Sequence, residues 1–170
     1  MDGNTEERGG MISVFNGPAP ALEIPSTVVE ETAVVSRWLA DRMSEGVKPE
    51  EVAIFVRSAE QLPRARAAVE AAGLSSALLE DDVETIRGRV ALGTMHLSKG
   101  LEFRAVVVMA CDDDVVPLQA RIEAVTDDAD LQEVYDTERH LLYVACTRAR
   151  DHLLVTGVDP ASEFLQDLVP

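Results

Sequence analysis

The chain has 170 residues, enough for one domain with a buried core, and its 46% hydrophobic content argues against disorder over most of its length. Only 4% of the residues are aromatic, so the core must consist of Val, Leu, Ile and Ala, as in a parallel sheet flanked by helices. The net charge of −16 excludes a free-standing nucleic-acid binder that relies on a basic face. Any role on nucleic acid must then rest on a few local contacts or on a basic partner.

The sequence indicates neither a metal site nor a membrane segment. Cys111 and Cys146 lie in apolar surroundings without metal-ligand spacing, which fits free thiols in a reducing cytosol. The acidic run Asp112–Asp114 lacks the spacing of a calcium-binding loop. No stretch approaches the roughly 18 apolar residues of a membrane span, and the acidic N-terminus has no signal-peptide core. We therefore expect a cytoplasmic protein with no metal and no membrane partner.

The first residues are predicted to stand apart from the folded domain. Residues 1–10 are polar and end in glycine, and we expect a disordered lead-in there. One domain is then expected over residues 11–170. It begins with a short apolar run, Met11–Phe15, which predicts an edge strand, and with the proline-rich stretch 16–25, which predicts irregular structure.

A helix and a buried strand follow. Thr27 and Glu30 form a capping-box pattern, which predicts a helix that stops near Gly46. The continuous apolar run Val52–Val56 predicts a central strand. Arg57 would then lie at the carboxyl end of that strand.

The middle of the chain alternates between helix and strand. Ser58 and Gln61 form another capping-box pattern and predict a helix to Ala72. A short strand at 76–79 comes next. Two further apolar runs then predict strands at 89–95 and 105–110. The connection between these last two strands holds an imidazole, a hydroxyl, an ammonium group and a carboxylate, which is more chemistry than a turn requires.

A long helix dominates the remainder. A short helix at 118–125 comes first, and Asp130 then acts as the predicted N-cap of a helix to about Ala149, with Glu138 on its polar side. A strand at 152–156 and a last short helix complete the chain. Strand and helix alternate with long crossovers, which predicts an α/β fold with a mostly parallel sheet and helices on both faces.

Polar side chains gather where such a sheet binds ligands, at the carboxyl ends of its strands. Arg57 follows one strand, and Thr94 and His96 end another, whereas Arg148 lies near the end of the long helix. Fixed arginines suit phosphate, because a guanidinium stays charged and can bond two oxygens. The alternative for each arginine is a salt bridge to a neighbouring acid. The chain has no Gly-x-x-x-x-Gly-Lys-Ser/Thr loop and cannot by itself hold a nucleotide and magnesium in the usual way.

Three segments resemble motifs of the UvrD/Rep/PcrA-like superfamily 1 DNA helicases. They are residues 52–58 (motif IV), residues 90–104 with Thr-Met-His-Leu-Ser-Lys-Gly-Leu-Glu-Phe (motif V), and residues 138–149 with Glu-Arg-His-Leu-Leu-Tyr-Val-Ala-Cys-Thr-Arg-Ala (motif VI). The Lys-Gly-Leu-Glu-Phe form is typical of the UvrD-like branch. The resemblance implies a RecA-like fold of the P-loop NTPase type, and specifically the second motor domain of such a helicase.

The resemblance also implies site residues. In the family, ATP lies between two motor domains, and the first supplies the phosphate loop and the carboxylates that hold Mg²⁺. Arg57 and Arg148 match the arginines that reach the γ-phosphate, and Glu102, with Gly100 beside it, matches the carboxylate at the nucleotide sugar. ATP and Mg²⁺ are therefore expected in the longer protein, with neither bound tightly by this chain.

Two further positions are implied to face DNA, and one family feature is missing. Thr94 and His96 match residues that touch single-stranded DNA, so single-stranded and duplex DNA and the N-terminal motor domain are the expected partners. Only residues 58–89 separate motifs IV and V, which leaves no room for the large 2B insertion. The resemblance implies 3′→5′ movement, and an isolated chain without ATPase activity.

Two other interpretations remain open from the sequence. The chain could be a stand-alone RecA-like interaction module, or a protein that completes the ATPase of a partner. It could also belong to a helicase–nuclease, which requires a nuclease domain beyond Pro170.

Overall fold

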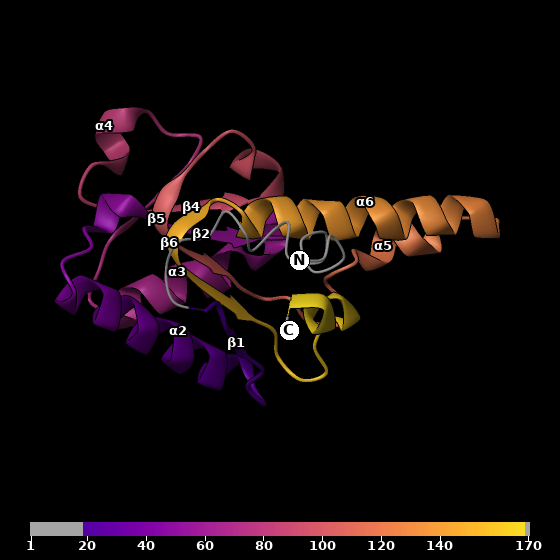
Figure 1. Cartoon of the computed structure of the whole chain (residues 1–170), viewed down its shortest axis with the longest axis horizontal. Coiled ribbons are helices and arrows are strands. Elements are labelled where there is room, and N and C mark those ends of the chain that lie inside the picture. The colour runs from indigo at the N-terminus through magenta and orange to yellow at the C-terminus, as the bar shows by residue number, and fades with distance from the viewer. Residues whose placement is uncertain (1–18, 169–170) are drawn as a thin grey trace, which may run out of the picture.

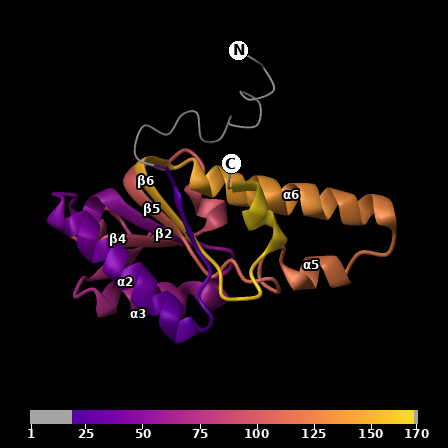
Figure 2. The same ribbon diagram turned by 60° about the horizontal axis from the view of Figure 1, so that its bottom comes forward.

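The computed structural model describes residues 19–168, so the lead-in predicted at 1–10 and the strand predicted at Met11–Phe15 lie outside the described residues. The described chain forms one six-stranded sheet in the order β1-β6-β5-β2-β4-β3, and all neighbouring strands are parallel. Helices cover both of its faces (Figures 1 and 2). The predicted α/β fold with a parallel sheet between two helical layers is confirmed.

Five of the six strands lie close to predicted positions, whereas β1 forms within the stretch 16–25, where the prediction of irregular structure is wrong because its residues pair with β6. The strands are β1 (Ala21–Glu23), β2 (Val52–Val56), β3 (Ser76–Leu78), β4 (Val90–Thr94), β5 (Phe103–Val108) and β6 (Ala149–Thr156). The middle strand β2 is buried at every residue, as its unbroken apolar sequence predicts. The predicted strand at 152–156 begins earlier, at Ala149.

The helices are of two kinds. The α-helices are α2 (Val28–Ser44), α3 (Leu62–Ala71), α4 (Val83–Ile86), α5 (Gln119–Glu123) and α6 (Asp128–Cys146), and the 3₁₀ helices are η1 (Pro49–Glu51), η2 (Ala59–Gln61), η3 (Met95–Ser98) and η4 (Glu163–Leu168). The N-cap of α2 is as predicted, because the Thr27 hydroxyl accepts a hydrogen bond from the Glu30 amide at 3.1 Å. Gly46, at φ +98°, follows the helix in a conformation that favours glycine.

Two predicted helix starts are wrong. The Asp127 side chain, not Asp130, caps α6, because its carboxylate accepts the Asp130 amide at 2.9 Å. The Ser58 hydroxyl caps no helix and has no hydrogen-bond partner among the described residues. The backbone carbonyl of Ser58 instead accepts the Gln61 amide at 3.0 Å and forms the 3₁₀ turn η2. The predicted last helix is likewise the 3₁₀ helix η4.

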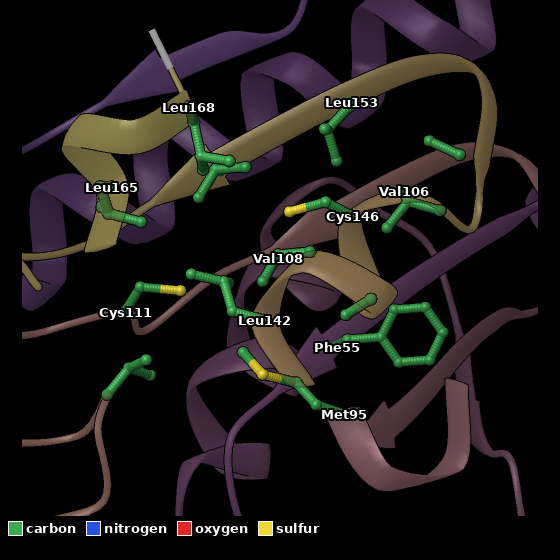
Figure 3. Close-up of a cluster of buried hydrophobic side chains, with 14 of the residues drawn as sticks. Phe55, Met95, Val106, Val108, Cys111, Leu142, Cys146, Leu153, Leu165 and Leu168 are labelled. Carbon is green, nitrogen blue, oxygen red and sulfur yellow. The ribbon is translucent and has the colours of Figure 1, made fainter. Parts of the chain in front are cut away.

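The core has two halves, one on each face of the sheet. Helices α2 and α3 pack on one face around Val35 and Val69. Helix α6 and η4 pack on the other face, where Leu142 and Phe164 belong to the same buried cluster as Phe55 of β2 (Figure 3 shows part of this cluster). The two cysteines are buried in this second half as free thiols.

The strand direction gives the sheet two different edges, one at the amino ends and one at the carboxyl ends of its strands. The connection 95–102 leaves β4 at the carboxyl edge and enters β5 at the amino edge, so it crosses a face of the sheet. Helix α6 crosses the same face, since it precedes β6 directly, and its N-terminal half extends past the sheet with α5 alongside (Figure 1).

Within residues 19–168, no helix has the length and apolar composition needed to cross a membrane. The same part of the chain contains no group of three or more His, Cys, Asp or Glu side chains suited to a metal ion.

Leu142→Ala should lower the free energy of unfolding by about 2–5 kcal/mol, because Leu142 is fully buried between α6 and the sheet. Urea denaturation of the 170-residue chain measures this. The matched control is Val29→Ala in α2, where 78% of the side chain is exposed and the change should stay within about 0.5 kcal/mol. Equal losses in both variants would contradict the assigned core.

Candidate functional site

The predicted site residues divide between the two edges of the sheet. Arg57 follows β2 at the carboxyl edge, two residues beyond the pairing of Phe55 with Val108 of β5. Arg148 precedes Ala149 at the amino edge, where that residue pairs with Phe103 of β5. Along the β5 segment, Arg57 is thus level with position 110, and Arg148 lies next to position 103. An extended segment between these two positions spans roughly 20 Å. The structure therefore does not bring the two arginines together.

Arg148 lies beside the other residues predicted to bind nucleotide. Its guanidinium Nη1 donates a hydrogen bond to the carbonyl of Leu101 at 3.3 Å, and its own carbonyl accepts the amide of Phe103 at 2.9 Å. These bonds join the end of motif VI to motif V. Glu102 is exposed next to this contact, and Gly100, also exposed, has φ +81°, a conformation that favours glycine.

The Arg148 guanidinium is held only by neutral oxygens. Nε donates to the carbonyl of Val144 at 3.1 Å, and Nη2 donates to the Thr147 hydroxyl at 2.9 Å. Among residues 19–168, no carboxylate lies within salt-bridge distance of this partly buried side chain. Its positive charge thus remains available to an anion at the amino edge.

Thr94 and His96 occupy the opposite edge. Thr94 is the last residue of β4, paired in register with Val56, and His96 is an exposed residue of η3. The Ser98 hydroxyl is buried and donates to the Met95 carbonyl at 2.8 Å, which closes the turn. The motif V connection therefore presents an imidazole at the carboxyl edge and a carboxylate, Glu102, at the amino edge.

Arg57 is buried in an ion pair. Only 4% of the residue is exposed, and its guanidinium donates to both carboxylate oxygens of Glu138, Nε to Oε1 at 2.8 Å and Nη2 to Oε2 at 2.7 Å. The prediction that Glu138 lies on the polar side of α6 is wrong. Glu138 follows Val134 and precedes Leu142 by four residues each, so it shares their buried face. This four-residue spacing is the sequence signal that indicates a buried position for Glu138.

Glu138 accepts two more hydrogen bonds, from the Leu118 amide at 2.9 Å and from Arg121 at 2.9 Å. Burial raises the pKa of this carboxyl, but the hydrogen bonds from Arg57, Leu118 and Arg121 outweigh burial and keep its pKa below the usual value of 4.5. One carboxylate thus ties the end of β2 and the start of α5 to the middle of α6.

A second buried carboxylate, which the sequence interpretation missed, lies on the other face. Glu31 of α2 is fully buried and accepts hydrogen bonds from Arg64, from the Ala110 amide at 2.9 Å and from the Thr156 hydroxyl at 2.7 Å. Arg64 also pairs with Asp112 at 2.8 Å. The spacing of Glu31 four residues before the buried Val35 was again the only sequence signal.

Two hollows of about 170 and 140 Å³ flank Trp38, where α2 covers β1 and β6. Arg42, which stacks on the Trp38 ring with 4.7 Å between guanidinium carbon and ring centroid, lines the larger one with His152. Neither hollow contains a residue predicted to bind ATP or DNA.

Comparison with known proteins identifies a family. The sequence model of the UvrD-like helicase C-terminal domain matches residues 29–159. The chain is 45% identical over 69 residues to YjcD of Bacillus subtilis (strain 168), a match that covers 39% of this chain and 9% of that protein. It is 41% identical over 76 residues to the ATP-dependent DNA helicase PcrA of Staphylococcus aureus (strain Mu50), which covers 45% of this chain and 10% of PcrA.

A solved structure shows the same fold. The C-terminal domain of a possible DNA helicase from Lactobacillus plantarum WCFS1 superposes with a TM-score of 0.66 at 22% identity, covering 94% of this chain and 88% of that one. Its length is comparable, whereas this chain matches about a tenth of the length of the two curated relatives.

Glu138→Gln should lower the free energy of unfolding by about 3–5 kcal/mol at pH 7, because it leaves the buried Arg57 without a counter-charge. Since the folded pKa of Glu138 lies below 4.5, the stability that its ionisation contributes is present above that pH. It is lost as the pH falls through the lower, folded pKa.

The difference between wild type and variant should therefore shrink as the pH falls below about 4.5. Thermal melts across that range measure it, with the exposed Glu133→Gln on the same helix as control. A difference that stays constant over this range would contradict the ion pair.

Proposed function

This chain belongs to the UvrD-like helicase C-terminal domain family, and on that premise we propose that it acts as the second motor domain of an ATP-dependent DNA helicase. In this role it supplies one wall of an ATP site and one part of a track for single-stranded DNA. The phosphate loop and the Mg²⁺ ligands belong to the N-terminal motor domain, since this sequence has no Gly-x-x-x-x-Gly-Lys-Ser/Thr loop.

One observation carries this proposal: the separation of the predicted nucleotide and DNA residues onto opposite edges of one sheet. Arg148 meets the motif V carbonyl of Leu101 beside Glu102, while Thr94 and His96 lie at the far end of the same connection. This arrangement suits a motor domain, in which closure around ATP at one edge would alter the grip on DNA at the other.

At the amino edge, Arg148 acts as the arginine finger. Its guanidinium carries no carboxylate partner among the described residues and can bond two phosphate oxygens. When the two motor domains close, Arg148 would meet the charge that develops as the γ-phosphoryl group leaves. The exposed carboxylate of Glu102 suits the hydroxyls of the nucleotide sugar, and Gly100 allows close approach of the backbone.

Arg57 is the one predicted finger that the geometry does not support. To contact the phosphate, Arg57 would have to leave Glu138 and its buried position. That position lies roughly 20 Å, measured along the strands, from the edge where Arg148 lies. We therefore assign the arginine-finger role in ATP hydrolysis to Arg148 and to no other residue of this chain.

At the carboxyl edge, the exposed His96 ring can stack on a base and the Thr94 hydroxyl can bond a backbone phosphate. Few phosphates are contacted, which agrees with a net charge of −16 and implies weak, salt-sensitive binding by the chain alone. Movement in the 3′→5′ direction is part of the proposal by family resemblance.

In the helicase that contains both motor domains, Arg148→Ala should lower kcat for ATP hydrolysis by about 10³-fold or more, while the KM for ATP changes only a few-fold. A coupled ATPase assay with saturating oligothymidine measures both constants. Arg150→Ala is the matched control: this exposed arginine is paired with Asp151, and the variant should keep kcat within about twofold. The 170-residue chain alone should show no turnover, and appreciable turnover that survives Arg148→Ala would refute the assignment.

His96→Ala should weaken binding of single-stranded DNA by about tenfold, because one base loses its stacking partner. Thr94→Val should weaken it less, through the loss of one phosphate contact. Fluorescence anisotropy with a labelled oligothymidine at fixed salt measures both. His140→Ala removes another exposed imidazole, from α6, and should leave the affinity unchanged. Equal losses at positions 96 and 140 would count against a DNA contact at the carboxyl edge.

A further inference from the structure

The buried pair of Arg57 and Glu138 joins the carboxyl edge of the sheet to helix α6. Arg57 directly follows β2 at the carboxyl edge, one residue beyond Val56, which pairs with Thr94 of β4, and Glu138 lies in the middle of α6. Both residues are almost completely buried, with 4% and 1% exposed. Their two hydrogen bonds of 2.7 and 2.8 Å form a planar fork that fixes both the distance and the angle between strand and helix.

Helix α6 leads from this pair to Arg148. Glu138 and Arg148 are ten residues apart, which corresponds to roughly 15 Å along a helix axis. Arg148 follows the C-cap, and its Nε donates to the carbonyl of Val144 in the last turn. Its guanidinium must therefore move with α6 when the helix slides or turns.

Apolar packing alone fixes the register of a helix less strictly than a fork of two hydrogen bonds. On the sheet side, α6 contributes the apolar side chains Leu142, Ala145 and Cys146, and these contacts are not directional. Glu138 lies on the same face and has one geometry in which both of its oxygens meet Arg57. It is the directional contact on this face of the helix.

We propose that Arg57 and Glu138 are positioning residues, which hold α6 in register with the carboxyl edge and thereby set the position of Arg148 at the amino edge. Arg121 and the Leu118 amide complete the clamp by holding the start of α5 on the same carboxylate. The effect of this pair on ATP hydrolysis rests on the proposed function. Its effect on the position of Arg148 does not. DNA that displaces the end of β2 would then shift the finger through α6.

The link is testable in the 170-residue chain by the ¹⁵N–¹H resonance of the Arg148 Nε–H group. Glu138→Gln and Arg57→Lys each remove the fork and should shift this resonance and accelerate its exchange with solvent. Glu31→Gln is the matched control, because it also removes a fully buried carboxylate from an arginine pair, but on α2. It should destabilise the chain and leave the Arg148 resonance in place.

The double variant Arg57→Met/Glu138→Leu separates positioning from stability. Apolar side chains of similar size should restore the melting temperature lost in Glu138→Gln, because no charge is left buried and unpaired. They cannot restore the fork, so the Arg148 resonance should remain shifted. A double variant with a native Arg148 resonance would overturn the proposal, and so would a Glu138→Gln resonance that matches wild type.

In the two-domain helicase, Arg57→Lys and Glu138→Gln should each lower kcat for DNA-stimulated hydrolysis by about tenfold with little change in the KM for ATP. The double variant should be no worse than either single variant, because all three lack the same contact. If Arg57→Lys alone abolishes hydrolysis, Arg57 acts directly on the nucleotide and the positioning role is wrong. If Arg148→Ala leaves hydrolysis intact, the proposed function fails while the resonance test still stands.

Discussion

The parallel direction of all six described strands is the constraint on which the rest of this structure depends. Each connection between successive parallel strands of the sheet must return from the carboxyl edge to the amino edge, so it crosses a face of the sheet. Two such crossings carry the motifs: the connection 95–102 and helix α6, which pack against each other on one face. A residue at either end of a crossing is thereby joined to the opposite edge through a single segment of the chain. This arrangement gives a small domain two distant surfaces that can respond to each other.

The two buried glutamates make that arrangement specific. Glu138 on α6 and Glu31 on α2 lie on opposite faces of the sheet, and each accepts hydrogen bonds from an arginine and from a backbone amide at or beyond the carboxyl edge. Burying a carboxylate is costly, and the cost is offset only when nearly all of its oxygen sites are occupied. Each helix layer is therefore tied to the sheet at one defined position, in addition to its apolar packing. The start of the segment 110–118 is bonded to Glu31 and its end to Glu138.

The sequence predicted the parts of the fold that depend on local pattern. The apolar run Val52–Val56 became the buried strand β2, and the capping residue Thr27 starts α2. The motif pattern also predicted the family, which the match over residues 29–159 confirms. Pattern and motif suffice here because a buried strand and a ligand-binding loop each require particular residue types at adjacent positions.

What could not be predicted depends on contacts between distant segments. Glu138 and Arg57 are 81 positions apart, and nothing local distinguishes a glutamate that faces a buried arginine from one that faces solvent. The charge of Glu138 suggests a solvent-facing residue and its helical spacing with Val134 and Leu142 suggests a buried one, and tertiary pairing with Arg57 decides between them. The Gln61 amide was expected to donate to the Ser58 hydroxyl. It donates instead to the Ser58 carbonyl and forms a 3₁₀ turn. The separation of Arg57 from Arg148 followed only once the strand register was known.

The most direct test is a crystal structure of the helicase that contains both motor domains, bound to oligothymidine and to a non-hydrolysable ATP analogue with Mg²⁺. We predict that the Arg148 guanidinium lies about 3 Å from a γ-phosphate oxygen, that Arg57 remains on Glu138, and that His96 contacts the DNA strand. A structure in which Arg57 has left Glu138 for the γ-phosphate, or in which Arg148 contacts no phosphate, would contradict this prediction.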